Sequence, residues 1–437
     1  MMAITLRAPV AMLLASIILT FTSPAGGQPT VTSDALDLQE FGPEIASEAA
    51  APVQPQPTPE LRRGMVHDTT TPQQQRERRY FERIIARIEP SLEGQPDRLG
   101  IYTHFFLREF VNDRRLFPVQ LDATLADDGQ TVRVTGYVAY AETRRAYLRF
   151  LQYLGFEQVD DAITMLPDTA VLGEELFGLL SVPHSFTLDA QGEKMTESLL
   201  GDPLWLLTTG ANDDYLVLSV EGYVGHVGRE KVHRMDAAAF RAHMDGPLAT
   251  IGRDVSLDDG RLIPAGARLR SLGVANDGRA LVEWPGSGPV AVAADAVTVR
   301  SNSTPASVIN ALETAQSFLG TPYVWGGNTT KGVDCSGLVQ SSFKAQGINF
   351  PRDADQQAYL GSLVATRWFR DNLRPGDTLY FLGERNGRIT HTAIYVGDGM
   401  YIEATGPKVK FTSFDPNHEA YDAQRDAGFC FAKRLLE

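Results

Sequence analysis

Two residues in the last third of the sequence have the side chains needed for nucleophilic catalysis. Cys335 lies in the segment 332–337, whose residues are Gly, Val, Asp, Cys, Ser and Gly, so small and polar neighbours surround the thiol. His391 follows it in the chain and could accept the thiol proton, which would leave a thiolate able to attack a carbonyl carbon. A lone cysteine is usually a small buried apolar residue, but these surroundings suit a nucleophile that solvent can reach.

The elements that would carry the cysteine can be predicted from apolar spacing and capping signals. Residues 308–319 have the pattern of an amphipathic helix. A second helix is expected to begin at Asp334 or Cys335 and to stop at Gly347. Cys335 would then lie at a helix N-terminus, where unpaired N–H groups and the positive end of the helix dipole favour the thiolate.

The position of the histidine can be predicted in the same way. His391 lies in the strand pattern 389–396, where a rigid sheet could fix its ring. His418 is the other histidine after the cysteine, and it lies in a polar, loop-like segment. His391 is therefore the predicted base.

Five short motifs in this region follow one another in a distinctive order. They occupy residues 320–327, 334–337, 350–352, 374–377 and 391–397. Together they resemble the NlpC-type peptidases of bacterial cell walls, and the resemblance covers residues 303–437. It implies a reduced papain-like fold, in which a helix carries the cysteine and packs on an antiparallel sheet that carries the histidine. It also implies hydrolysis of peptidoglycan stem peptides, commonly between γ-D-glutamate and a diamino acid, with no metal or organic cofactor.

The resemblance assigns the central catalytic roles. Cys335 would be the nucleophile, and its backbone N–H could help to hold the oxyanion. His391 would take the thiol proton and later protonate the leaving amine. Tyr323 would lie beside the reacting carbonyl, although it could also be a core aromatic residue. For Trp325 we expect a place in the core.

Three further residues have two interpretations each. By resemblance, Asp334 and Ser336 can hold the free amine of the L-alanine of a stem peptide, but both could instead cap the helix. Arg352 could bind a carboxylate of the substrate, or it could form a salt bridge with Asp353 or Asp355. Neither pair of alternatives is resolved by the sequence.

The third catalytic position departs from the family pattern. The family has His, Asn or Gln twelve residues after the histidine, whereas this chain has Glu403. A carboxylate can also orient a histidine, and a charged partner should raise the pKa of His391. A three-residue loop centred on Gly397 would place His391 opposite Glu403, but a two-residue turn at 398–399 would place it opposite Gly406. We predict that Glu403 orients the ring of His391. The alternative is that Glu403 is a surface residue and that a backbone group or water orients the ring.

The second cysteine, Cys430, lies in the apolar segment 428–432. We expect a buried, inert thiol there. Export would permit a disulfide between Cys430 and Cys335, which would silence the nucleophile.

The N-terminus has the features of an export signal. Arg7 precedes a mostly apolar run at 8–22, and small residues at 23–27 offer a cleavage site. The run is too short for a comfortable membrane span, which favours a cleaved signal. An uncleaved anchor is the alternative interpretation. We therefore predict that the protein is located in the periplasm or outside the cell, in association with the wall. We predict no stable membrane span after the signal is cleaved.

The middle of the chain predicts several small domains. An amphipathic stripe follows residue 76, and residues 116–166 suggest a β-hairpin, a helix and a strand, either a unit that contacts membrane or wall or a plain spacer. Short strand patterns separated by turn residues between 176 and 300 suggest two small β-barrels. Residues 221–227 resemble the late strands of bacterial Src-homology-three barrels, although Tyr223 could simply be a turn residue.

These observations predict an α+β protein with six parts. They are a signal peptide at 1–27, a disordered linker at 28–75, a small α/β domain at 76–175, Src-homology-three-like barrels at 176–240 and 241–302, and the papain-like peptidase domain at 303–437.

Composition excludes other classes of function. With 54 acidic and 40 basic residues and a net charge of -14, the chain lacks the basic balance of nucleic-acid-binding proteins. Two cysteines exclude a Cys-rich zinc site. The predicted partners are peptidoglycan stem peptides or muropeptides; the sequence leaves the oligomeric state open. A non-catalytic wall-binding or scaffold protein is the main alternative, and acyl transfer to an amine or alcohol is a third.

Overall fold

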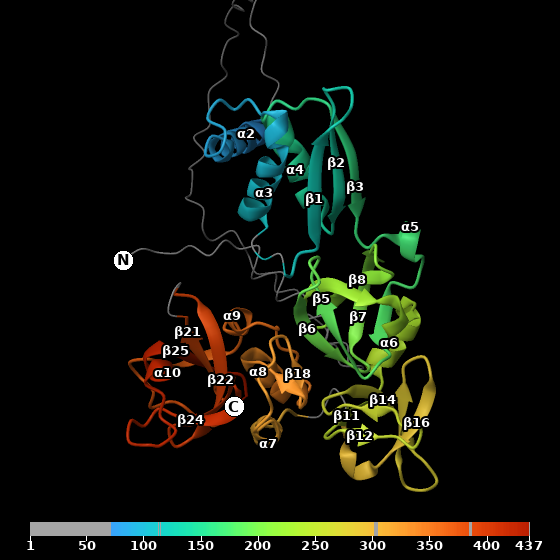
Figure 1. Cartoon of the computed structure of the whole chain (residues 1–437), viewed down its shortest axis with the longest axis vertical. Helices are drawn as coiled ribbons and strands as arrows, with labels where there is room; N and C mark the ends of the chain where they lie inside the picture. Colours follow the sequence, from blue (N-terminus) through green and yellow to red (C-terminus); the bar gives the residue numbers. More distant parts are fainter. Residues whose placement is uncertain (1–70, 112, 114, 301–304, 384–386, 437) are drawn as a thin grey trace, which may run out of the picture. The chain divides into compact units, whose positions relative to one another are not determined.

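A computed structural model describes residues 71–111, 113, 115–300, 305–383 and 387–436 (Figure 1). The predicted signal peptide and all of the predicted linker before residue 71 lie outside the described residues. The chain divides into two compact units between Ile84 and Ile85. Among the described residues, no helix combines the length and the apolar character needed to cross a bilayer.

The first described helix, α2 (Pro72–Ile85), begins inside the segment predicted as linker. Proline suits the first turn of a helix, because the N–H that it lacks would have no helical partner there. Phe81, Ile84 and Ile85 are buried, as the amphipathic stripe predicts.

A three-stranded sheet with helices follows. Its elements are η1 (Pro96–Arg98), α3 (Leu99–Phe110), β1 (Val119–Leu125), β2 (Val132–Val138), α4 (Ala141–Tyr153) and β3 (Val159–Met165). β1 and β2 pair antiparallel, and the α4 crossover brings β3 parallel to β2. The hairpin, helix and strand therefore occur where the periodicity predicts them. The sequence analysis missed α3, which has no side-chain N-cap and is rich in aromatic residues.

Two antiparallel sheets occupy the region predicted as barrels. The first has the order β10-β4-β7-β8-β9-β5-β6, and the second the order β16-β15-β14-β11-β17, beside the β12-β13 pair. Their elements are α5 (Thr169–Leu172), β4 (Phe177–Leu180), β5 (His184–Leu188), β6 (Lys194–Leu199), β7 (Pro203–Thr209), β8 (Asp214–Ser219), β9 (Val224–Gly228), η2 (Arg229–Lys231), β10 (Val232–Met235), α6 (Ala237–Asp245), β11 (Leu248–Ile251), β12 (Val255–Ser256), β13 (Leu262–Ile263), β14 (Arg268–Val274), β15 (Ala280–Trp284), β16 (Gly288–Val292), η3 (Ala294–Ala296) and β17 (Val297–Arg300). α6 spans residues 240 and 241, between which the sequence analysis places the boundary of the two predicted barrels.

The C-terminal part combines helices with a six-stranded antiparallel sheet in the order β20-β25-β21-β22-β23-β24. Its elements are α7 (Val308–Ser317), β18 (Asn328–Thr329), β19 (Gly332–Val333), α8 (Cys335–Lys344), α9 (Ala354–Gln357), β20 (Ser362–Thr366), β21 (Thr378–Leu382), β22 (Ile389–Gly397), β23 (Met400–Thr405), β24 (Lys408–Ser413), α10 (Ala423–Gly428) and β25 (Phe429–Arg434). The fold class is α+β, with antiparallel sheets preceding this helix-plus-sheet domain.

The core of this domain lies between α8 and the sheet. Leu338 and Phe343 of α8 are buried in one apolar cluster with Ile394 of β22 and Ile402 of β23. This cluster holds α8 against β22 and β23 in the middle of the sheet. This packing positions the cysteine-bearing end of α8 next to β22.

Gly337, in the first turn of α8, allows this end of the helix to approach the preceding loop. A Cβ atom at this position would lie 2.3 Å from the carbonyl oxygen of Gly327 and 2.6 Å from Oδ1 of Asn328. A side chain would therefore force the helix and the loop apart.

We predict that Gly337→Ala lowers the free energy of unfolding by about 1–3 kcal/mol, because the added methyl group would displace the backbone of the preceding loop. The midpoint of thermal unfolding should fall. Gly100→Ala in α3 is the matched control, because a Cβ there meets nothing within 4 Å. An equal fall in both variants would contradict this account of Gly337.

Candidate active site

Cys335 is the first residue of α8, as predicted, and Asp334 is its N-cap. Oδ1 of Asp334 accepts a 2.7 Å hydrogen bond from the N–H of Gly337. The N-cap carboxylate thus fixes the end of the helix that carries the thiol.

The thiol environment differs from the prediction in two respects. Cys335 is only 8% exposed, so it is buried rather than open to solvent. Burial and, to a smaller extent, the neighbouring Asp334 carboxylate raise the pKa of its thiol to about 12. Hydrogen bonds from the backbone of Thr392 and Ser336 lower the pKa but do not offset burial. Burial and the Asp334 carboxylate therefore act against the thiolate that the helix N-terminus favours.

His391 lies on β22 and is buried. Its Nε2 is 2.5 Å from Oε2 of Glu403 on β23. Glu403 is 0% exposed, and its Oε1 accepts a 2.6 Å hydrogen bond from the hydroxyl of Thr412. The alternative of a surface glutamate is wrong, and Glu403 occupies the position of a group that orients the ring.

The observed strand register differs from both of the predicted ones. The hairpin has a two-residue turn at 398–399, but a bulge follows, since Gly397 pairs with Met400 whereas Tyr395 pairs with Tyr401. If this pairing is continued from Tyr395 along the two strands, Glu403 is a diagonal neighbour of His391 on the same face of the sheet. Long side chains reach each other across such a diagonal.

The pKa shifts of this pair follow from burial and from a cation that the sequence analysis did not identify. Burial opposes ionisation of Glu403, but the hydrogen bonds from His391 and Thr412 and the charge of Arg425 are among the causes that lower its pKa to about 2. Nε of Arg425 lies 3.1 Å from Oε2 of Glu403. Contrary to the prediction, the pKa of His391 is lowered, because burial outweighs the hydrogen bond to Glu403 and Arg425 adds to the lowering.

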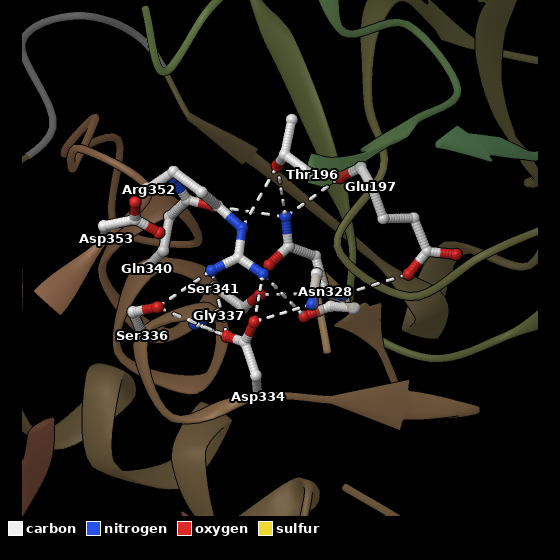
Figure 2. Close-up of polar contacts among 12 residues, drawn as sticks. Thr196, Glu197, Asn328, Asp334, Ser336, Gly337, Gln340, Ser341, Arg352 and Asp353 are labelled. Atoms are coloured by element: carbon white, nitrogen blue, oxygen red, sulfur yellow. Dashed lines mark hydrogen bonds and ion pairs between the residues drawn. The ribbon is translucent and has the colours of Figure 1, made fainter. Parts of the chain in front are cut away.

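Arg352 has a different partner from both of the predicted ones (Figure 2). Its side chain is 1% exposed, and its two terminal nitrogens donate to the two carboxylate oxygens of Asp334 over 2.9 Å and 2.6 Å. It also donates to Oγ of Ser336 and to Oγ1 of Thr196 on β6. Sequence spacing did not identify Asp334 as the partner, because loop packing and not local order brings them together.

This pairing bears on the two interpretations of Asp334 and Ser336. The Asp334 carboxylate accepts five hydrogen bonds, from Gly326, Gly337, Ser336 and twice from Arg352. It is a helix cap whose charge Arg352 compensates. Ser336 lies inside the first turn of α8 and is not its N-cap.

The two aromatic residues before the cysteine differ in environment. Tyr323 is half-buried and packs against the apolar cluster of the domain. Burial and the nearby Cys335 and Asp334 raise the pKa of its hydroxyl, which places Tyr323 near the thiol. Trp325 is 68% exposed, so the expectation of a core residue is wrong. The chain turns directly after it, at Gly326, where φ is 76°.

Residues from the preceding part of the chain also reach this region. The Tyr223 hydroxyl, just before β9, donates to Asp353, the residue next to Arg352. Arg115 forms ion pairs with both Asp353 and Asp355. In the same region, Asn328 donates to the backbone carbonyl of Glu197 over 2.9 Å (Figure 2).

Cys430 lies on β25 with a free thiol, and Cys335 is also free, so the disulfide alternative is excluded. The expectation of a buried Cys430 is wrong, because its side chain is partly exposed.

Residues 320–426 match the NlpC/P60 family. The chain is 40% identical over 119 residues to the γ-D-glutamyl-L-lysine dipeptidyl-peptidase of Bacillus subtilis, covering 26% of this chain and 38% of that protein. It is 40% identical over 87 residues to the Escherichia coli protein named murein DD-endopeptidase MepS/murein LD-carboxypeptidase, covering 20% of this chain and 43% of that protein. The chain thus spans well under two thirds of these relatives.

A crystal structure of an NlpC/P60 family protein from Bacillus cereus has the same fold. It aligns with a TM-score of 0.51 at 20% identity, over 60% of this chain and 100% of that one. The aligned 60% of this chain is more than residues 303–437 make up. The likeness in fold therefore extends into the sheets that precede the C-terminal domain.

We predict that Cys335 is alkylated by iodoacetamide more slowly than Cys430 at pH 7.5, because only thiolates react and Cys335 is the more buried. The rate at Cys335 should rise continuously up to at least pH 9. Cys430→Ser and Cys335→Ala isolate each thiol for mass spectrometry. A fast, pH-independent reaction at Cys335 below pH 8 would show a stable thiolate instead.

Proposed function

We propose that this chain, whose C-terminal part is an NlpC/P60 family domain, is a cysteine peptidase that hydrolyses peptidoglycan stem peptides. The observation that carries the proposal is the buried His391–Glu403 pair on the sheet that packs against the helix carrying Cys335. The nucleophile, the base and a group that orients the base are the parts that thiol-dependent hydrolysis requires.

The protonation states favour general-base catalysis from a neutral pair. The pKa of the Cys335 thiol is raised and that of His391 is lowered, which favours a protonated thiol and an unprotonated imidazole at neutral pH. As the sulfur attacks the peptide carbonyl, His391 takes the thiol proton and then passes it to the leaving amine. Water, deprotonated by the same histidine, then hydrolyses the thioester. Glu403 holds the ring through Nε2, so Nδ1 is the nitrogen that exchanges the proton.

The oxyanion of this reaction would form beside the N-terminus of α8. The first N–H groups of a helix have no helical partner, and that of Cys335 is among them. It would donate to the developing negative charge. The Tyr323 hydroxyl would lie beside the reacting carbonyl.

The proposed bond is that between γ-D-glutamate and a diamino acid. This assignment is supported by the printed activity of the Bacillus subtilis relative, which is a γ-D-glutamyl-L-lysine dipeptidyl-peptidase. The name of the Escherichia coli relative supports murein as the material that contains it. The proposed location is the periplasm or the cell exterior, where the predicted export signal would direct the chain.

We further propose that a free N-terminal amine of the stem peptide meets Asp353 and not Asp334. The Asp334 carboxylate is buried in its ion pair with Arg352, whereas the Asp353 side chain is 26% exposed and accepts a hydrogen bond from the hydroxyl of Tyr223. An ammonium group there would compete with Arg115 for the carboxylate. Tyr223 belongs to the first of the two proposed Src-homology-three-like barrels, which would then form one wall of the site.

The proposed function is tested with L-Ala-γ-D-Glu-diaminopimelate, the mature protein and mass spectrometry. Free diaminopimelate should be released by the parent and not by Cys335→Ala. Failure of the parent to cut both this peptide and purified peptidoglycan would contradict the proposal and favour a non-catalytic wall-binding protein.

The amine-binding proposal makes a separate prediction. Asp353→Asn should raise KM for the free tripeptide by about tenfold or more, since an ion pair to the substrate is lost, and should change little for the N-acetylated peptide. Asp355→Asn is the matched control, because Asp355 also pairs with Arg115 but is not bonded to Tyr223. Equal effects on the two peptides would refute the role of Asp353.

A further inference from the structure

The carboxylate of Glu403 has a third partner besides His391 and Thr412. Nε of Arg425 lies 3.1 Å from Oε2, the same oxygen that contacts His391. Glu403 is completely buried, and the Arg425 side chain is 27% exposed. One carboxylate oxygen is therefore shared between an imidazole and a guanidinium.

The guanidinium is held in this place by two elements. Its Nη2 donates a 2.8 Å hydrogen bond to Oγ1 of Thr405, at the end of β23. Its backbone N–H donates to the side chain of Asp422, the N-cap of α10. The fork of the arginine thus spans Glu403 and Thr405 on one strand, which a lysine ammonium could not reproduce with the same geometry.

The charges explain why a cation is needed here. A buried carboxylate beside a neutral imidazole would be an uncompensated charge, which is strongly unfavourable. Without another cation, the pair would be stabilised by protonating His391, and a protonated histidine cannot act as the base. Arg425 supplies the positive charge, so that Glu403 can be ionised while the imidazole remains neutral. The neutral His, Asn or Gln that the NlpC-type resemblance implies at this position would not require such a cation.

We propose that Arg425 is a positioning residue of the proposed peptidase reaction: its ion pair with Glu403 lets a carboxylate orient His391 while the imidazole stays an unprotonated base. The inference rests on the proposed function for its catalytic meaning. The pairing itself is a property of the folded chain and can be measured without a substrate.

Among the described residues, the other groups near His391 do not supply this charge; Lys410 on β24 is the cross-strand partner of Glu403 but forms no ion pair with it. Asp334, the N-cap of α8, acts on His391 through its negative charge, and Phe381 of β21 contributes an uncharged ring 5.4 Å from the imidazole. On neighbouring elements, Glu313 of α7 is exposed, Asp353 and Asp355 at α9 pair with Arg115, and Tyr401 is a buried phenol of β23. On α10, Asp426 pairs with Arg370 over 2.5 Å.

The first experiment is a titration of His391 by NMR in protein labelled at histidine, with the signal assigned by its loss in His391→Gln. Arg425→Gln should raise the pKa of His391 by at least about half a pH unit, because a nearby positive charge is removed. The acidic limb of kcat/KM should move upward by the same amount. Arg370→Gln is the matched control, since Arg370 is 28% exposed and pairs with α10 without contacting Glu403. Equal titrations in the parent and Arg425→Gln would overturn the proposal.

The second experiment is a double-mutant cycle on thermal stability, which remains informative if the single variants are poorly folded. Glu403→Gln and Arg425→Gln each leave one charge unpaired, whereas the double variant leaves none. The fall in the midpoint of thermal unfolding in the double variant should therefore be smaller than the sum of the falls in the two single variants. Strictly additive losses would show that the two residues do not act as a pair.

These outcomes separate the inference from the proposed function. Absence of peptidase activity in the parent, with the predicted shift in the titration, would refute only the proposed function. Peptidase activity with no shift in the titration and additive losses of stability would refute only the role of Arg425.

Discussion

A buried ion pair between Arg352 and Asp334 is the interaction on which the arrangement of the site depends. Removing one partner of such a pair typically costs about 3–5 kcal/mol, because an unpaired charge remains in the interior. Here the pair also joins separate pieces of chain: the cap of α8, the loop at Gly326 and Gly327, and Thr196 from a preceding sheet. The position of Cys335 follows directly, since its neighbour is the anchored carboxylate.

A second consequence concerns protonation. Anchoring Asp334 places a negative carboxylate beside the thiol, and the tight packing excludes water from the sulfur. Both effects stabilise the neutral thiol. On the histidine side, burial and Arg425 stabilise the neutral imidazole. In the proposed mechanism, the site would therefore hold an uncharged nucleophile and an uncharged base, and the proton would move as the carbonyl is attacked.

The sequence predicted those features that depend on local order. The helix beginning at Cys335, the strand that carries His391, and the hairpin, helix and strand of residues 119–165 all follow from periodicity and capping. The partner of Arg352 and the contact of Arg425 with Glu403 could not be predicted in this way, because each pairing is set by the packing of separate elements. The burial of Cys335, which acts against the thiolate, could not be predicted for the same reason: the helix terminus is visible in the sequence, but its burial is not.

The central claim is that the sulfur of Cys335 carries the acyl group during peptide hydrolysis. The most direct measurement is to mix the protein with excess L-Ala-γ-D-Glu-diaminopimelate, quench with acid within milliseconds to seconds, and map the adduct by mass spectrometry. The account predicts an L-Ala-γ-D-Glu thioester on the peptide that contains Cys335, absent from Cys335→Ala. Hydrolysis of the tripeptide by Cys335→Ala at the parent rate, or an acyl adduct on another residue, would contradict it.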